Sequence, residues 1–261
     1  PQYTGLLPAS FLPQFEQMLA SVRPRLDTGL PDPVTFGECL SYFSDVLYDA
    51  YALTMAALAQ RHNICIMAGS TLYFAGQHLR HRAFLFGRDG ELLGYQDKLS
   101  LTTFEQSVGL EAESEVKVFS TPAGSAAMLL GGDADYFEIA RAAASLGARL
   151  LLHPTALTGE YTSVRAALGL NMRVQENRLW GVQSTLCGDT GLGFAAEGPA
   201  AVFGPVALSH TQNGTIARTR GGFEAEVLCT TLDMERLVRV QNPYIQDRNP
   251  AFMEAYIDRL L

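Results

Sequence analysis

The stretch LLGGDADYFEIARAAASLGARLLLHPT at residues 129–155 decides the fold. Apolar residues lead into a Gly-Gly turn, and the amphipathic segment Phe137–Leu146 then ends at Gly147, where a helix C-terminal cap is expected. A second apolar run over Arg149–His153 predicts a buried strand. The order strand, turn, helix, strand is typical of an α/β protein whose helices cover the faces of a sheet.

The same alternation continues on both sides of this stretch. The three- and four-residue spacing of apolar residues predicts a long helix over Phe36–Gln60. The step Asp89-Gly90 between two apolar runs predicts an antiparallel hairpin. The other expected elements are strands at Asn63–Ser70, His81–Gly87, Leu92–Asp97, Val116–Ser120, Ala126–Leu130, Leu179–Thr185, Ala200–Phe203 and Glu226–Leu232, and helices over Ser163–Asn177, from Met234 and after Pro250.

Composition narrows the classes of function. The 261 residues are 48% hydrophobic and 18% charged, as in ordinary globular proteins, and no apolar run approaches the roughly 18 residues of a membrane-spanning helix. The 19 Lys and Arg against 27 Asp and Glu give a net charge of −8 without a basic stripe, so we expect neither a nucleic-acid partner nor a membrane partner. The four cysteines form no CxxC pair and the five histidines show no metal-ligand spacing. These features predict a reduced, cytoplasmic protein without metal or cofactor.

The turn after the central apolar run is where an α/β enzyme can expose a nucleophile. Here Gly131 and Gly132 offer no side chain. Asp133 and Asp135 are typical of a helix start, and the spacing of Asp135 and Glu138 predicts a capping box. From these residues alone, a structural turn and a functional site are about equally well supported.

These segments resemble the nitrilase (carbon-nitrogen hydrolase) superfamily, and most closely its amidase-like branch. The family carries its nucleophilic Cys in a pattern such as LICYDxxFPELAR, and that Cys falls on Gly131. Its catalytic Lys lies in a K-x-x-L pattern that matches Lys98, and a second Glu seven residues later matches Glu105. The general base, a Glu in a Pro-Glu step, falls on Gln2, and Asn171–Asn177 is similar to the family's R-A-x-E-N helix.

The resemblance implies an αββα four-layer sandwich and a homodimer or larger oligomer formed through the flanking helices. No repeat or low-complexity linker divides the chain, so we expect a single carbon-nitrogen hydrolase-like domain over residues 1–261. A sandwich of this family begins with a strand, a helix and a second strand before its first Glu, whereas Gln2 lies at the start of this sequence. We therefore expect the domain to lack that first strand-helix-strand unit.

The resemblance also implies how the chemistry is altered. In the family, Glu takes a proton from Cys, the thiolate attacks an amide or nitrile carbon, and Lys stabilises the oxyanion. Glycine cannot attack, and the neutral amide of Gln2 cannot serve as a base. We therefore predict a protein inactive by this mechanism, which binds a small amide, amine or carboxylate at Lys98 or acts through oligomer contacts. Gly132, Glu138, Thr155 and Cys187 are the predicted substrate-contacting positions.

Other interpretations remain open. Lys98 alone would more often be a solvated strand-end lysine, and Glu105 a surface charge. Cys187 follows a strand whose end lines the family's pocket, so it is either a small buried residue or a relocated nucleophile. An active hydrolase of small amides or N-carbamoyl amines would need Cys187, or a water activated by Glu105 and Glu138. Finally, Gly131 and Gln2 can be read as substitutions that trap substrate.

Overall fold

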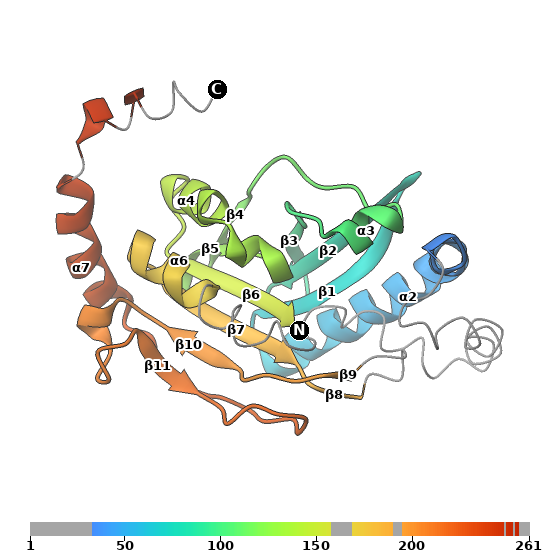
Figure 1. The fold of residues 1–261 in the computed structure, drawn as a ribbon. Coiled ribbons are helices and arrows are strands. Elements are labelled where there is room, and N and C mark those ends of the chain that lie inside the picture. Colours follow the sequence, from blue (N-terminus) through green and yellow to red (C-terminus); the bar gives the residue numbers. More distant parts are fainter. Residues whose placement is uncertain (1–32, 158–168, 190–194, 248, 253, 256–261) are drawn as a thin grey trace.

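The decisive stretch forms the middle of a six-stranded mixed sheet, here called sheet B, in the order β11-β10-β7-β6-β5-β4 (Figure 1). The computed structural model describes residues 33–157, 169–189, 195–247, 249–252 and 254–255. Strands β5 (Gly124–Met128), β6 (Leu150–Ala156) and β7 (Trp180–Leu186) run parallel. Helix α4 (Phe137–Ser145) connects the first two strands, and α6 (Leu170–Asn177) precedes the third. The predicted strand, turn, helix, strand order is confirmed.

A second sheet, sheet A, is antiparallel and contains three strands. Its members are β1 (Ile66–Ala75), β2 (His78–Phe86) and β3 (Leu92–Asp97). Phe86 pairs with Leu92 across the predicted hairpin turn, in which Gly90 has a φ of +81° that favours glycine. The hairpin is therefore confirmed at the Asp-Gly step.

Side-chain alternation along β2 explains why layers form on both faces of sheet A. Phe84 and Phe86 pack with Tyr51 and Ala59 of the long helix α2 (Pro33–His62). The intervening residues Ala83 and Leu85 pack with Met128 and Leu130 from sheet B. A strand places successive side chains on opposite faces, so each face acquires its own apolar partner.

Sheet B repeats the same logic. Ala127 and Leu129 lie on its outer face, in a buried cluster with Ala140 and Ala143 of α4 and with Val174 of α6. The order of layers is thus α2, sheet A, sheet B, and α4 with α6 (Figure 1). This arrangement confirms the expected αββα sandwich. Burying each large apolar side chain contributes about 1.5–3 kcal/mol.

The remaining elements are short except for the 13-residue helix α7, and the strands among them connect or extend the sheets. They are α3 (Thr103–Ser107), β4 (Val118–Thr121), η2 (Gly131–Asp135), β8 (Gly188–Asp189), β9 (Ala195–Ala196), β10 (Ala201–Phe203), η4 (Val206–Leu208), β11 (Thr215–Arg218) and α7 (Met234–Gln246). In the described part of the chain, no helix is both long and apolar enough to cross a membrane.

Two local predictions are wrong. Residues Glu226–Leu232 form no strand; most are exposed, Val227 by 91%, and strand-forming side chains do not make a strand without a neighbouring ladder. The predicted capping box of Asp135 and Glu138 is also absent, because α4 begins after Tyr136 without a side-chain cap. Asp135 belongs to the preceding 3₁₀ turn. The predicted helix over Ser163–Asn177 is described only from residue 169 onward, where it begins at Leu170.

Candidate functional site

Lys98 lies directly after β3 and is buried, with 2% of its surface exposed. Its backbone N–H donates to the carbonyl of His81 at 2.8 Å. The preceding residue, Asp97, accepts two hydrogen bonds from the Arg82 guanidinium at 2.6 and 2.7 Å, and this guanidinium stacks 3.7 Å above the Tyr95 ring. These contacts fix the end of β3. The structure excludes the reading of Lys98 as a solvated strand-end lysine.

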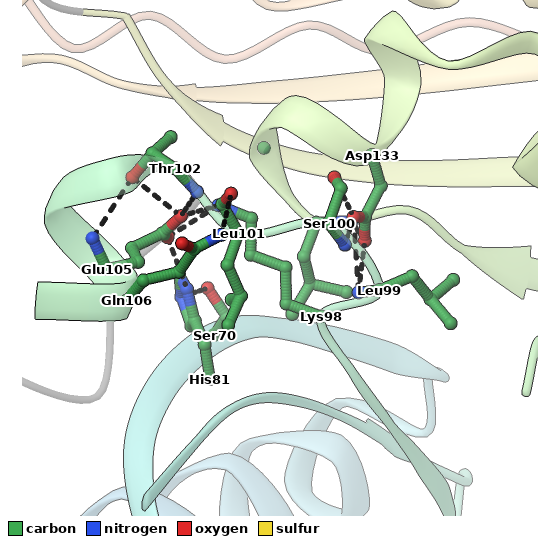
Figure 2. Close-up of polar contacts among 12 residues, drawn as sticks. Ser70, His81, Lys98, Leu99, Ser100, Leu101, Thr102, Glu105, Gln106 and Asp133 are labelled. Atoms are coloured by element: carbon green, nitrogen blue, oxygen red, sulfur yellow. Dashed lines mark hydrogen bonds and ion pairs between the residues drawn. The ribbon is translucent and has the colours of Figure 1, made fainter. Parts of the chain in front are cut away.

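Glu105 is the partner of Lys98, as the seven-residue spacing suggested. The Lys98 Nζ lies 2.5 and 2.6 Å from the two carboxylate oxygens of Glu105, which is 3% exposed (Figure 2). Thr102 begins α3 with a capping box: its Oγ1 accepts from the Glu105 N–H at 3.2 Å, and its own N–H donates to Glu105 Oε2 at 2.8 Å. The S/T-x-x-E signature of this box is present in the sequence at Thr102 and Glu105, 33 positions before the capping box predicted at Asp135 and Glu138.

His81 and Ser70 belong to the same cluster, and sequence reasoning missed both. His81 is fully buried; its Nε2 lies 2.9 Å from Ser70 Oγ and its Nδ1 lies 3.4 Å from Glu105 Oε1 (Figure 2). Burial lowers the pKa of His81 and outweighs the effect of Glu105, so the imidazole is neutral at pH 7. The strand register could have indicated that His81 is buried, because side chains alternate along β2 and His81 lies on the same inward face as Ala83 and Leu85.

The charge state of Glu105 follows from the same contacts. Burial raises the pKa of this carboxyl, but the hydrogen bond with His81 and the charge of Lys98 outweigh burial and hold the pKa far below its ordinary value. Glu105 is therefore a carboxylate and Lys98 its buried counter-ion. The pair carries no net charge.

Gly131, which takes the position of the nucleophile in the resemblance, begins the turn after β5. It is buried and has a φ of +52°, in the left-handed region that favours glycine. Its carbonyl accepts a hydrogen bond from Nε2 of the buried His153 at 2.8 Å. The turn is held by its backbone, and the position itself offers no reactive atom.

Asp133 connects this turn to the loop that carries Lys98. Its fully buried carboxylate accepts the backbone N–H of Leu99 and the N–H and Oγ–H of Ser100, the two Ser100 contacts at 2.8 and 2.7 Å (Figure 2). It also accepts the backbone N–H of Leu130. Burial raises the pKa of Asp133, while the hydrogen bonds from Ser100 and Leu130 lower it. The sequence predicted only a helix-start residue here. Asp133 instead joins two segments that lie 33 positions apart.

The other predicted positions are less closely associated. Thr155 is buried near the end of β6, and Gly132 is half-buried in the turn. Glu138 is exposed in the first turn of α4. Cys187 is half-buried, and its thiol donates to the carbonyl of Glu224 at 3.6 Å. Gln2 lies outside the described residues.

The chemistry available to the described residues is therefore limited. The Lys98 ammonium has three donors, and Glu105 takes two of them, which leaves at most one for a ligand. Glu105 itself accepts from Lys98 and Thr102 and contacts His81, so it is poorly placed to activate a water together with the exposed Glu138. Among the described residues, no group of three or more His, Cys, Asp or Glu side chains is arranged to hold a metal ion.

Comparison with known proteins assigns the chain to a family. The model of the carbon-nitrogen hydrolase family matches residues 31–242. The chain belongs to the carbon-nitrogen hydrolase family. Among curated proteins, this chain is 28% identical to the probable hydrolase YhcX of Bacillus subtilis (strain 168) over 196 residues, and the matched region covers 72% of this chain. It is 27% identical over 159 residues to the chloroplastic omega-amidase of Arabidopsis thaliana, which covers 58% of this chain.

Solved structures give the same result for the fold. The NitN amidase from Neterenkonia sp. AN1 superposes with a TM-score of 0.66 at 26% identity, over 82% of this chain and 77% of the amidase. Saccharomyces cerevisiae Nit3, a member of branch 10 of the nitrilase superfamily, gives a TM-score of 0.67 at 18% identity, over 77% of this chain and 71% of Nit3. The family member spans only 37% of YhcX and 43% of the omega-amidase.

Proposed function

We propose that this carbon-nitrogen hydrolase relative does not hydrolyse C–N bonds by a Cys-Glu-Lys mechanism and instead binds a small ligand at Lys98. The observation that carries the proposal is the glycine at position 131, which has no side chain and which the family resemblance aligns with the nucleophile. Losing the nucleophile of a catalytic unit lowers turnover by about 10⁶-fold, and a second loss in the same unit adds little. The expected replacement of the general base by Gln2 therefore does not alter the conclusion.

The charge of the site favours a neutral ligand. Lys98 and Glu105 cancel one another, and Gln2 would add no charge. A carboxylate or an ammonium ion would lose its hydration in this buried region without a free counter-ion, which is costly. An amide loses less, and its carbonyl can accept the remaining Lys98 donor. Of the three ligand classes that the sequence predicts, a small amide fits best, and solved structures include a variant of the Nesterenkonia sp. AN1 amidase in complex with butyramide.

The structure supplies little support for an active alternative. Cys187 donates its thiol proton to a backbone carbonyl, and none of its described contacts is with an imidazole or carboxylate that would activate it. Glu138 is exposed, while the oxygens of Glu105 are already engaged. We therefore do not propose a relocated nucleophile.

Ammonia release from butyramide and from ω-amides of dicarboxylic acids tests the absence of turnover. We expect no release above the protein-free rate, and binding of butyramide seen by ligand-observed NMR. The double variant Lys98→Met/Glu105→Gln removes both buried charges together and should abolish binding. Lys117→Met is the matched control, because Lys117 is a partly exposed lysine outside the site. Turnover at enzyme-like rates, or butyramide binding that survives the double variant, would refute the proposal.

Restoring the family's Cys and Glu at positions 131 and 2 tests whether the rest of the catalytic site is still intact. The left-handed φ at Gly131 makes Gly131→Cys cost about 1 kcal/mol, so this variant should fold. We expect Gly131→Cys alone to remain inactive for lack of a base, and Gly131→Cys with Gln2→Glu to release ammonia. Failure of the pair would show that more than these two residues was lost, and would also count against their being substitutions that trap substrate.

We also propose that the protein forms a homodimer or a larger homo-oligomer through α4 and α6. Both helices carry large apolar side chains on the surface: Tyr136 before α4 is 53% exposed, Phe137 is 41% exposed, and Met172 of α6 is 41% exposed. Light scattering after size-exclusion chromatography measures the mass directly. The substitution Phe137→Glu should shift the protein toward monomer, whereas Leu92→Glu, at an exposed residue of sheet A, should leave the mass unchanged.

A further inference from the structure

A β-bulge in β1 decides which of its side chains faces sheet B. Met67 pairs with Leu85 of β2, on the face that packs against sheet B. The next pair along the ladder joins Ser70 to Ala83, so β1 holds one residue more than β2 between the two pairs. Gly69 lies at this bulge with a φ of +78°, in the region that favours glycine. Paired residues share a face of the sheet, so the bulge turns the Ser70 hydroxyl inward where Gly69 would otherwise lie.

The contacts of His81 identify which ring nitrogen carries its proton. Nδ1 lies 3.4 Å from Oε1 of Glu105, a carboxylate oxygen that can only accept. An unprotonated Nδ1 would turn its lone pair toward that negative charge. The neutral ring therefore carries its proton on Nδ1, and Nε2 accepts a hydrogen bond from the Ser70 hydroxyl at 2.9 Å (Figure 2). The hydroxyl that the bulge turns inward thus supports this tautomer.

The two oxygens of Glu105 are held by different groups. Oε2 accepts the backbone N–H and the hydroxyl of Thr102 at 2.8 and 3.0 Å. Oε1 faces the Nδ1–H of His81. One anchor on each oxygen fixes the plane of the carboxylate, whereas Thr102 alone would leave that plane free to turn. Lys98 Nζ donates to both oxygens, so the plane of the carboxylate sets the direction of its third N–H.

We propose that His81 is a positioning residue, which acts through Glu105 to aim the third donor of Lys98 at the bound amide. Ser70 holds the ring in the tautomer that this role requires. The inference rests on the function proposed for Lys98. It adds that the His81 position supplies a hydrogen-bond donor to Glu105, and that filling the same space with an apolar side chain is not enough.

Two substitutions separate donation from packing. His81→Leu fills the space and removes the donor, whereas His81→Asn places an amide N–H near the position of Nδ1, because both nitrogens are bonded to Cγ. Butyramide affinity, measured by ligand-observed NMR titration, should fall about tenfold in His81→Leu and less than about threefold in His81→Asn. His78→Leu is the matched control: it is the same change on the same strand, at a side chain that is 58% exposed, and should leave the affinity unchanged.

A purely structural role predicts the opposite order of the two variants. Asparagine is smaller than leucine and buries an amide oxygen, so His81→Asn should be no more stable than His81→Leu in urea. If His81→Leu binds butyramide as well as His81→Asn or better, the affinity follows packing and the proposal is overturned.

Two spectra test the proposal without a ligand. The ¹⁵N signals of the His81 ring at pH 7 should place the proton on Nδ1, and a proton on Nε2 would overturn the proposal. The Lys98 Nζ resonance, assigned by its absence from Lys98→Met/Glu105→Gln, should shift in His81→Leu and return toward its original position in His81→Asn. The same resonance position in both variants would also overturn it. If the unmodified protein does not bind butyramide, the function proposed for Lys98 fails, while these spectra still decide whether His81 positions Lys98.

Discussion

Removing one partner of the Lys98–Glu105 pair should destabilise the fold severely, while removing both should not. The side chains of this pair are 2% and 4% exposed, and Nζ lies 2.5 Å from Oε1. Lys98→Met leaves the Glu105 carboxylate buried without its counter-ion, and Glu105→Gln leaves the Lys98 ammonium in the same state. Breaking a buried pair in this way costs about 3–5 kcal/mol. The melting temperature should fall by roughly 6–20 °C at about 2–4 °C per kcal/mol.

The double variant Lys98→Met/Glu105→Gln leaves no unpaired charge. The glutamine can still accept the N–H of Thr102, which Glu105 does at 2.8 Å in the present structure. We therefore expect the double variant to cost no more than either single change. The coupling free energy between the two positions should then be about 3 kcal/mol or more, at the upper end of measured couplings.

Equilibrium unfolding in urea, followed by far-UV circular dichroism and by Trp180 fluorescence, measures all three free energies. Lys117→Met is the control: its Nζ lies 3.6 Å from Glu113 in a pair that is 32% and 25% exposed, and such pairs contribute about 0–1 kcal/mol. A cost below about 1 kcal/mol for both single variants, or additive effects in the double variant, would show that the pair is not the buried counter-ion system described above.

Three further predictions concern the surrounding frame. Burial lowers the pKa of His81, so below about pH 6.5 the unfolded chain takes up a proton before the folded chain does. The free energy of unfolding should therefore be constant above that pH and fall below it. Glu105, with its strongly lowered pKa, should add a further loss of stability below about pH 4.5. Urea midpoints that do not change between pH 7 and 5 would contradict this. Asp133→Asn places an amide among four donors and should cost about 2 kcal/mol in urea unfolding, whereas an effect near zero would mean that these bonds are not made. Gly204→Ala puts a methyl group into the Trp180 ring and should cost about 1–3 kcal/mol with a shift in tryptophan emission; unchanged emission would count against that contact.

Local periodicity was sufficient to predict the main elements. The stretch from residue 129 to 155 gave a strand, a turn, a helix and a strand, because the period of apolar residues changes from two to about 3.6 and glycines mark the boundaries. The hairpin at Asp89-Gly90 follows from the backbone conformation that this step favours. The layer order came from the family resemblance, since periodicity does not say which faces meet.

The contacts of the site depended on tertiary structure and were only partly predictable. The spacing of Lys98 and Glu105 anticipated their pairing, but three of the four donors to Asp133 lie 33 or 34 positions away, which no local pattern encodes. The sequence also offers two capping-box patterns, and only the one at Thr102 is used. The segment Glu226–Leu232 has the composition of a strand, yet pairing depends on a neighbour that its own sequence does not specify.

Retention of Lys98 and Glu105 is explained by folding alone and is not evidence for catalysis. Each is buried, and either one becomes an unpaired buried charge if the other is lost. Gly131, which matches the nucleophile in the family resemblance, is different, because its turn is held by its own carbonyl on His153 and, two residues later, by Asp133. A side chain at that position contributes nothing to these bonds, and the left-handed φ favours glycine. Under the proposed loss of hydrolysis, glycine is therefore the residue that the fold tolerates most readily at position 131, while replacement of Lys98 or Glu105 alone is costly.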